Sequence, residues 1–206
     1  MKKFRTLFLA ALLILALAGC GAKASGGNAS VPPQTEKGAL TVSFDYQAQS
    51  GHASNQFAIW IEDASGKLVK TLYATKFTAN GGYSNRPDSI KNWVAKSGLA
   101  DMTKTQVDAV SGATPKTGKL TYTWDLTDSD GNAVSDGSYT YMVEGTIRWK
   151  NYILFSGVIN IGGGQATVVA APSYHFEADD SNNALTESSI ESSMISNVTA
   201  EYIPAN

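Results

Sequence analysis

Alternation of apolar and polar residues dominates this chain from about residue 39 onward. A period of two puts successive side chains on opposite faces of a β-strand, so each alternating stretch predicts a strand with one buried face. The predicted strands cover residues 40–46, 57–63, 67–73, 120–126, 138–145, 152–161 and 198–203. Many short strands at close spacing are typical of an antiparallel β-sandwich, so we expect a mainly β fold.

The region from about residue 84 to 118 interrupts this strand pattern. Within it, Pro87 and Asp88 resemble a helix start, and apolar residues recur at helical spacing up to Gly98. This spacing predicts a short helix over 88–97. The remainder, from about 103 to 119, is predicted to be an exposed loop, so the sandwich carries one long insertion.

Turn signals account for other connections. Ser65-Gly66 lies between two predicted strands and indicates a β-hairpin. The segment 128–132, Asp-Ser-Asp-Gly-Asn, is similar to half of a calcium-binding loop, but no Glu stands at the twelfth position, and a hairpin turn explains it better. Residues 177–194 are polar and are predicted to form a long surface loop.

The first 38 residues differ in kind from the rest. Lys2, Lys3 and Arg5 precede an apolar run over 7–18 that is too short to span a bilayer, which indicates an export signal over residues 1–20. Residues 21–38 are rich in Gly, Ala and Ser and are expected to form a flexible tether. We therefore expect one folded domain over residues 39–206.

The signal ends in Leu17-Ala18-Gly19-Cys20, which resembles the lipobox of bacterial lipoproteins. The resemblance implies that Cys20 is diacylated and becomes the new N-terminus after cleavage. Two or three acyl chains hold a protein durably on a membrane, whereas one chain does not. We therefore expect an extracytoplasmic protein, in the periplasm or on the cell surface, anchored to membrane lipid through Cys20. An ordinary signal peptide with a chance cysteine is the alternative.

Composition excludes several kinds of chemistry. Cys20 is the only cysteine, so the folded body has no disulfide, no thiolate nucleophile and no cysteine-ligated metal. Removal of Lys2, Lys3 and Arg5 changes the formal net charge from −2 to −5. This balance argues against a nucleic-acid-binding protein, because such surfaces need basic patches.

No catalytic or metal-binding constellation is apparent in the sequence. His52 and His175 are the only histidines, and neither has the spacing of a metal-ligand pair, so surface or hydrogen-bonding roles are favoured. No Ser lies in a nucleophile elbow and no acid–base pair is marked, so a hydrolase is the least favoured class. We expect no metal site and a carrier or binding domain, not a catalyst.

The four tryptophans are candidates for stacking on an aromatic cofactor or for relaying electrons. Trp60 and Trp124 lie in predicted strands, where burial in the core is the better explanation. Trp93 lies near the predicted 103–119 loop, and for it the two roles stay open. Trp149 is the fourth candidate.

One string in the insertion, Asp108-x-x-Ser111-Gly112-Ala113-Thr114, resembles the acceptor motif of extracytoplasmic flavoproteins. In that class a dedicated flavin transferase attaches FMN to the last Thr through a phosphoester bond. The resemblance implies covalent FMN on Thr114, with Gly112 and Ala113 small enough to leave its hydroxyl accessible. Asp108 would be recognised by the transferase or would fix the loop.

A purely structural role for the same string is the alternative. Ser111 and Gly112 would then form a turn, and Pro115 would rigidify the exit from it.

Two wider resemblances concern the domain. Residues 59–72 and 124–139 are similar to the immunoglobulin-like domain of flagellar hook-capping proteins, which implies an Ig-like sandwich. Through residues 57–72, 108–116 and 124–139, the stretch 39–204 as a whole resembles domain-of-unknown-function family 2271, exported bacterial proteins often encoded near flavin transferases and membrane redox components.

Two functions from different classes follow. The first is a membrane-anchored redox carrier with FMN on Thr114, which exchanges electrons with a membrane redox protein. The second is a non-enzymatic Ig-like binding or scaffold module that docks a partner through the insertion over 84–118.

Overall fold

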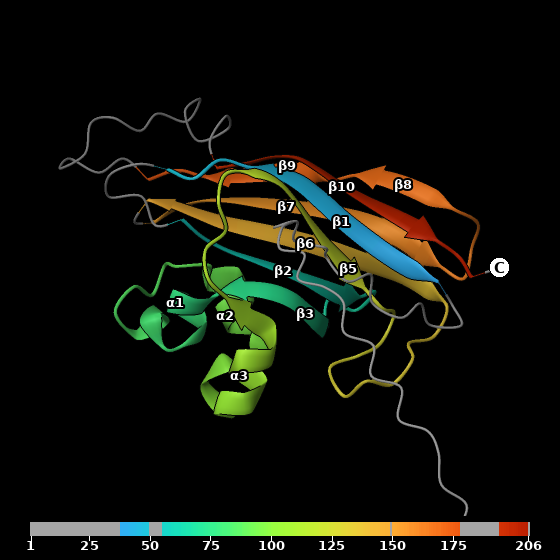
Figure 1. Ribbon diagram of the computed structural model, residues 1–206, viewed down its shortest axis with the longest axis horizontal. Helices are drawn as coiled ribbons and strands as arrows, with labels where there is room; N and C mark the ends of the chain where they lie inside the picture. Colours follow the sequence, from blue (N-terminus) through green and yellow to red (C-terminus); the bar gives the residue numbers. More distant parts are fainter. Residues whose placement is uncertain (1–37, 50–54, 149, 178–193, 206) are drawn as a thin grey trace, which may run out of the picture. The chain divides into compact units, whose positions relative to one another are not determined.

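Two β-sheets lie face to face in the computed structural model of the chain (Figure 1), which describes residues 38–49, 55–148, 150–177 and 194–205. The strands are β1 Ala39–Tyr46, β2 Gln56–Asp63, β3 Leu68–Thr75, β4 Ser111–Gly112, β5 Gly118–Trp124, β6 Gly137–Arg148, β7 Asn151–Ile161, β8 Ala166–Val169, β9 Ala171–His175 and β10 Ile195–Ile203. A four-stranded sheet has the order β5-β1-β10-β8, and a six-stranded sheet has the order β4-β3-β2-β6-β7-β9. Each strand pair is antiparallel except β3 with β4.

The structure confirms the predicted mainly β sandwich and a strand in each of the seven predicted stretches. The hairpin between β2 and β3 is also confirmed, with Gly66 at φ +80 in its turn. Three strands were not predicted: β4, β8 and β9.

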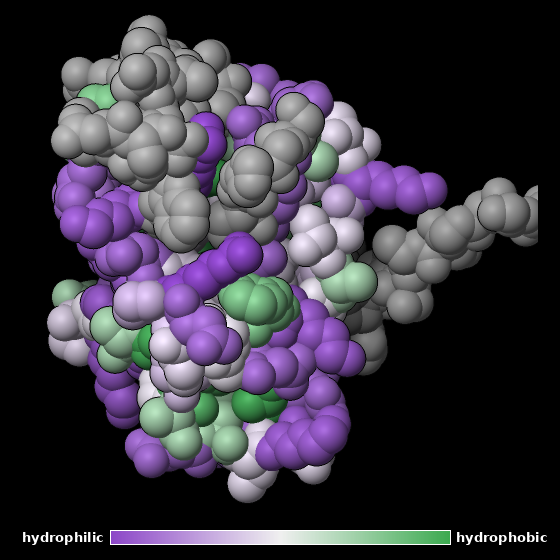
Figure 2. All heavy atoms as spheres, turned by 90° about the vertical axis from the view of Figure 1, so that its left-hand side faces the viewer, coloured by the Kyte–Doolittle hydropathy of each residue, from purple (hydrophilic) through white to green (hydrophobic). Residues whose placement is uncertain are grey.

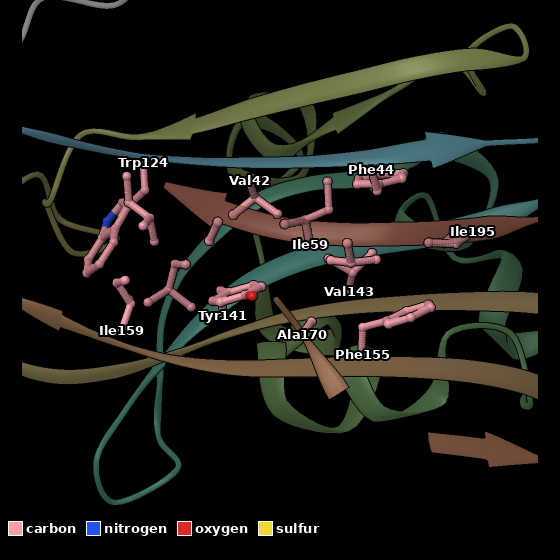
Figure 3. Close-up of a cluster of buried hydrophobic side chains, with 14 of the residues drawn as sticks. Val42, Phe44, Ile59, Trp124, Tyr141, Val143, Phe155, Ile159, Ala170 and Ile195 are labelled. Atoms are coloured by element: carbon pink, nitrogen blue, oxygen red, sulfur yellow. The ribbon is translucent and has the colours of Figure 1, made fainter. Parts of the chain in front are cut away.

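The main hydrophobic core fills the space between the two sheets. Strand β1 shows the expected alternation, with Leu40, Val42 and Phe44 buried and the residues between them partly exposed. Figure 3 shows how such side chains from both sheets converge, among them Val42, Phe44, Ile59, Trp124, Tyr141, Val143 and Phe155. Each buried side chain of this size contributes roughly 1.5–3 kcal/mol of transfer free energy, so this core dominates the stability of the domain.

Strand β2 is buried on both faces, unlike β1. Seven of its eight residues are buried, because its inner face meets the main core while its outer face meets a second hydrophobic cluster. The second cluster contains Ala58, Trp60, Ala74, Ala79, Ile90, Trp93, Leu99 and Val107. Most of these residues belong to the insertion, which therefore covers the outer face of the six-stranded sheet.

The insertion between β3 and β5 is more ordered than the sequence pattern indicated. It contains α1 Lys76–Ala79, the 3-10 turn Gly82–Ser84, α2 Lys91–Ser97, the 3-10 turn Leu99–Asp101 and α3 Lys104–Val110. Figure 1 shows the three α-helices on the outer side of the six-stranded sheet. The helix predicted over 88–97 is confirmed as α2, which begins only at Lys91 because Ile90 adopts a left-handed conformation with φ +41.

The prediction of an exposed loop from 103 to 119 was wrong in its first half. Thr103 and Gln106 form a capping box at the start of α3, in which each side chain bonds to the backbone of the other residue. Such a box satisfies two otherwise unpaired N–H groups and nucleates the helix. Val107 of α3 is buried in the second cluster, which anchors the helix to the sheet.

Buried polar groups attach the insertion to the sheet beneath it. The side chain of Gln56 on β2 accepts hydrogen bonds from the Thr75 and Thr78 hydroxyls at 2.7 Å and 3.1 Å, and Thr78 bonds to Ser89 at 2.8 Å. The Trp93 indole N–H donates to Thr71 on β3 at 3.0 Å. Buried polar groups are costly unless paired, so these bonds specify where the insertion sits.

Glu144 on β6 caps helix α2 from below. Its Oε1 accepts from the Asn92 amide side chain at 2.8 Å and its Oε2 accepts from the Trp93 backbone N–H at 2.9 Å. Burial raises the pKa of this carboxyl above its ordinary value, although the hydrogen bonds from Trp93 and Asn92 act in the opposite direction. Glu144 therefore links strand β6 to the start of helix α2, and its raised pKa makes the stability of the domain depend on pH.

The hairpin turn predicted over 128–132 is confirmed only locally. An antiparallel bridge between Thr127 and Ala133 pairs the residues on either side of the turn. Strands β5 and β6, which flank it, belong to different sheets, so beyond this bridge the turn leads the chain from one sheet to the other.

Several predictions lie outside the described residues. They concern the signal over 1–20 with Cys20, the tether predicted over 21–38 except Gly38, His52, Trp149, and residues 178–193 of the surface loop predicted over 177–194. Among the residues that the structure does describe, no helix is both long and apolar enough to cross a membrane.

We predict that Trp93→Ala lowers the free energy of unfolding by about 3–5 kcal/mol, because the substitution leaves a cavity in the second cluster and removes the bond to Thr71. Denaturant unfolding measures the change. Val169→Ala is the control, since Val169 is 73% exposed and its truncation should change stability by no more than about 0.5 kcal/mol. Equal effects of the two substitutions would contradict the role of Trp93.

We also predict that the titration of Glu144 makes the free energy of unfolding depend on pH. A carboxyl whose pKa is higher in the folded than in the unfolded state binds more protons when folded, so its contribution to stability falls as pH rises from the unfolded pKa through the folded one. As pH rises through that range, the unfolding free energy of wild type should therefore fall relative to that of Glu144→Gln. A difference that stays constant with pH, or that moves toward wild type, would contradict the raised pKa.

Candidate functional site

The motif residues 111–114 lie where the insertion returns to the sandwich. Ser111 and Gly112 form β4, which pairs in parallel with Ala74 and Thr75 at the end of β3. The chain then crosses to Gly118, where β5 begins in the other sheet. Figure 1 shows this crossing from the edge of one sheet to the edge of the other. The motif therefore closes one open side of the sandwich.

Thr114 is exposed at the middle of this crossing, as is Ala113 before it. On the far side, the Thr117 hydroxyl accepts a hydrogen bond from the Ala48 backbone N–H at 2.9 Å. Thr114 is thus an accessible hydroxyl between two fixed points, β4 and Thr117. Among the described residues, no hydrogen bond joins it to a carboxylate or an imidazole, so a reaction at this hydroxyl needs a base from elsewhere.

Tyr73 on β3 fixes the motif from beneath and was not predicted from the sequence. Its hydroxyl donates to the Ala113 carbonyl at 2.6 Å. A Cβ atom at Gly112 would lie 2.8 Å from Cε2 of the Tyr73 ring, which is closer than packed atoms come. The motif glycine therefore has a structural cause here: only glycine allows β4 to pass this close to the ring.

A cluster of aromatic rings supports Tyr73. Its ring lies 5.0 Å from that of Tyr122 on β5 and 5.3 Å from that of Phe57 on β2, and Tyr46 on β1 lies 5.3 Å from Phe57. Burial raises the pKa of Tyr46 to about 12 and also raises the pKa of Tyr73 and Tyr122. These phenols therefore stay protonated at neutral pH, and Tyr73 remains a hydrogen-bond donor to the motif.

Two polar atoms in this region lack a hydrogen-bond partner among the described residues, the Tyr46 hydroxyl and the Ser111 Oγ. An unsatisfied buried hydroxyl costs roughly 1–3 kcal/mol. Ser111 is therefore held in place by the strand pairing of β4 and not by its own side chain.

Asp108 lies apart from the rest of the motif, on helix α3. Its carboxylate bonds to Lys104 one turn earlier in the same helix, and this bond, with a smaller contribution from Lys76, lowers its pKa. The side chain is 43% exposed. Because its hydrogen bond stays within the helix, the described contacts give no support to a role in fixing the crossing segment, and recognition by another protein is the role that its exposure permits.

None of the three tryptophans that the structure describes is exposed beside the motif. Trp60, Trp93 and Trp124 are each fully buried, so the core role predicted for Trp60 and Trp124 is confirmed, and the question left open for Trp93 is answered in favour of the core. None of the three is available to stack on a group attached at the surface.

The other sequence candidates occupy ordinary structural positions. The His175 ring stacks on Tyr152 with centroids 4.9 Å apart and lies 3.2 Å from a Glu177 oxygen. No group of three metal-binding side chains occurs in the described part of the chain.

The acidic turn over 125–132 contains a cation of its own. The Lys70 ammonium from β3 lies 3.4 Å from the Asp125 carboxylate, donates to the Thr127 hydroxyl and lies 3.1 Å from the Asp128 carbonyl. Oxygen atoms of the kind that bind calcium thus surround a lysine.

Comparison with known proteins gives one match. The model of a family described as "Predicted periplasmic protein (DUF2271)" matches residues 38–177. Neither the curated proteins nor the solved structures contain a match to the chain.

We predict that Gly112→Ala destabilises the domain by about 1–3 kcal/mol, since the added methyl group must displace Tyr73 or β4. Gly164→Ala is the matched control, because no atom lies within 4 Å of the corresponding Cβ position and its φ is not in the left-handed region. Chemical denaturation of both variants measures the effect. If Gly112→Ala were as stable as the control, the close approach of β4 to Tyr73 would be refuted.

Proposed function

Because the chain belongs to the DUF2271 family of predicted periplasmic proteins and so acts outside the cytoplasm, we propose that it is a redox carrier with FMN attached covalently to Thr114. A flavin transferase would install the cofactor. The observation that carries the proposal is the placement of Thr114: an exposed hydroxyl on a short segment whose two ends are fixed to the sandwich.

The attachment reaction requires only what this site offers, together with a transferase. The Thr114 Oγ forms a bond to the phosphorus on the FMN side of FAD, and the pyrophosphate P–O bond breaks so that AMP leaves with the electron pair. The hydroxyl proton passes to a base of the transferase or to water, since no base lies beside Thr114 among the described hydrogen bonds. A nucleophile without its own base suits a substrate of another enzyme better than an enzyme.

The fixed segment also suits recognition by a second protein. A substrate loop that is already held in one conformation loses little conformational entropy when an enzyme binds it. Here the strand pairing of β4 with β3 and the hydrogen bond from Tyr73 to Ala113 hold the residues immediately before Thr114. Asp108, exposed on α3, is the residue that we assign to recognition by the transferase.

The cofactor, when attached, supplies one- or two-electron transfer, and the protein supplies its position. Because Thr114 lies on the surface and Trp60, Trp93 and Trp124 are buried, the cofactor would remain accessible to solvent and to other proteins. Accessibility of this kind favours a carrier that exchanges electrons with partners over an enzyme that encloses a substrate.

We further propose that Cys20 is lipidated and anchors the carrier to a membrane. The lipobox-like sequence over 17–20 supports this, as does the location of the family outside the cytoplasm. Anchoring would keep the carrier near a membrane redox protein that serves as its electron donor or acceptor.

We predict that the chain gains the mass of FMN less one water when it is co-expressed with a flavin transferase, and that it fluoresces as a flavoprotein after denaturing electrophoresis. Thr114→Ala should abolish both signals. Thr105→Ala is the matched control, because Thr105 is an exposed threonine of the same insertion on α3, and it should be labelled like wild type.

Two outcomes would refute the attachment. One is a wild-type chain that gains no FMN, which would favour the binding or scaffold module. The other is labelling that survives in Thr114→Ala, which would place the cofactor on another residue.

A further inference from the structure

Charge is distributed unevenly over the domain. Residues 76–119 carry seven Lys and Arg against three Asp, whereas the rest of the described residues carry four Lys and Arg against ten Asp and Glu. A chain that is acidic overall thus concentrates its positive charge in the insertion. Since the motif belongs to this segment, the distribution bears on what approaches Thr114.

Three lysines of the insertion lie next to the motif in the chain or in the sheet. Lys76 directly follows Thr75, which pairs with Gly112, and Lys116 and Lys119 follow Thr114 along the chain. All three are exposed, and no ion pair joins any of them to a carboxylate among the described residues. Other cations of the insertion are engaged, such as Lys96 with Glu62 at 3.0 Å and Arg86 over the Phe77 ring.

Most of the negative charge outside the insertion lies at the opposite end of the strands, although the exposed Asp45 on β1 lies opposite Lys119 at the motif end. The register of β5 on β1 pairs Tyr46 with Gly118 beside the motif, and Leu40 with Trp124 at the other end. Beyond Trp124 follow Asp125, Asp128, Asp130 and Asp136, and the β2–β3 turn begins at Asp63. The domain is therefore polarised along its strands, with a basic motif end and an acidic end.

The side of the domain that carries the insertion is hydrophilic. Figure 2 views this side, where hydrophilic side chains cover most of the described surface and hydrophobic ones form small separate groups. A partner that binds here is selected by charge more than by apolar contact, which is typical of fast and transient encounters.

We infer that the basic motif end is the docking surface for the flavin transferase, and that the transferase presents an acidic face around its bound FAD. The inference rests on the proposed function, because it names the partner of the same site. Charge complementarity raises association rates by 10- to 1,000-fold as an order of magnitude at low ionic strength. The pyrophosphate of FAD adds negative charge at the point that must reach Thr114.

The reaction favours a protein over a membrane surface as the occupant. A transferase has to bring the pyrophosphate of FAD to the Thr114 hydroxyl, and it then lies against Lys116 and Lys119, which follow Thr114 closely in the chain. A lipid surface has no such reason to approach this residue.

The test compares charge reversals at the motif end with one at the acidic end. Lys76→Glu, Lys116→Glu and Lys119→Glu, singly and together, are set against Lys67→Glu, an exposed lysine in the β2–β3 turn. Each motif-end reversal should lower kcat/KM for FMN transfer by about three- to tenfold at low salt with kcat unchanged, and the deficit should shrink as salt screens the charges. Lys67→Glu should behave like wild type.

A second measurement separates this inference from the proposed function. The association rate of the transferase with the Thr114→Ala chain, which cannot be labelled, should fall with salt and should fall further in the triple reversal. A wild-type chain that gains no FMN refutes the proposed function. Association rates that change neither with salt nor with charge reversal refute the docking surface.

Three other results would also overturn the docking surface. The first is an equal loss of kcat/KM in Lys67→Glu. The second is a loss that persists at high salt, which would indicate a local effect on the reaction. The third is charge-dependent binding to phosphatidylglycerol vesicles combined with unaltered association with the transferase, which would assign the surface to a membrane.

Discussion

The need to cover the outer face of the six-stranded sheet governs much of this structure. Strand β2 carries large apolar side chains on both faces, so the two-sheet core leaves Trp60 and its neighbours without cover. The insertion supplies that cover with Trp93, and Glu144 and Thr71 satisfy the polar groups that are buried with it. Once the insertion is packed in this way, its last residues lie against the end of β3, where they pair as β4. The position of the motif is thus a consequence of how the sheet is covered.

The sequence predicts those parts of the fold that depend on one-sided burial. Strand β1 alternates because only one of its faces is buried, and this period is visible without any partner. The uninterrupted apolar run of β2 indicates burial on both faces, and so a second layer that covers the sheet. Strands β4, β8 and β9 were not predicted because they have two, four and five residues, too few to establish a period, and they form only by pairing with their neighbours. Helix α3 could have been predicted from the spacing of Thr103 and Gln106.

The candidate site was also predictable only in part. The resemblance to the acceptor motif was enough to select Asp108 and residues 111–114, and Thr114 does lie on the surface. The contact that shapes the segment was not accessible, because Tyr73 and Ala113 are 40 residues apart and meet only when the insertion has folded. The small size of Gly112 had been attributed to access by a transferase, whereas the Tyr73 ring beneath it gives a reason internal to the fold. The glycine of the proposed recognition motif is therefore also required for packing against Tyr73.

The lysine within the acidic turn has a consequence for the environment in which the protein acts. Lys70 is part of strand β3, so its ammonium group meets the Asp125 and Asp128 oxygens at a concentration set by the fold and not by the surrounding medium. Outside the cytoplasm, the concentrations of dissolved ions vary with the surroundings of the cell. A turn that is stabilised by a bound divalent ion loses that stabilisation when the ion becomes scarce. In this turn the positive charge is the side chain of Lys70, so the contacts of the Asp125 and Asp128 oxygens with it do not require a dissolved divalent ion.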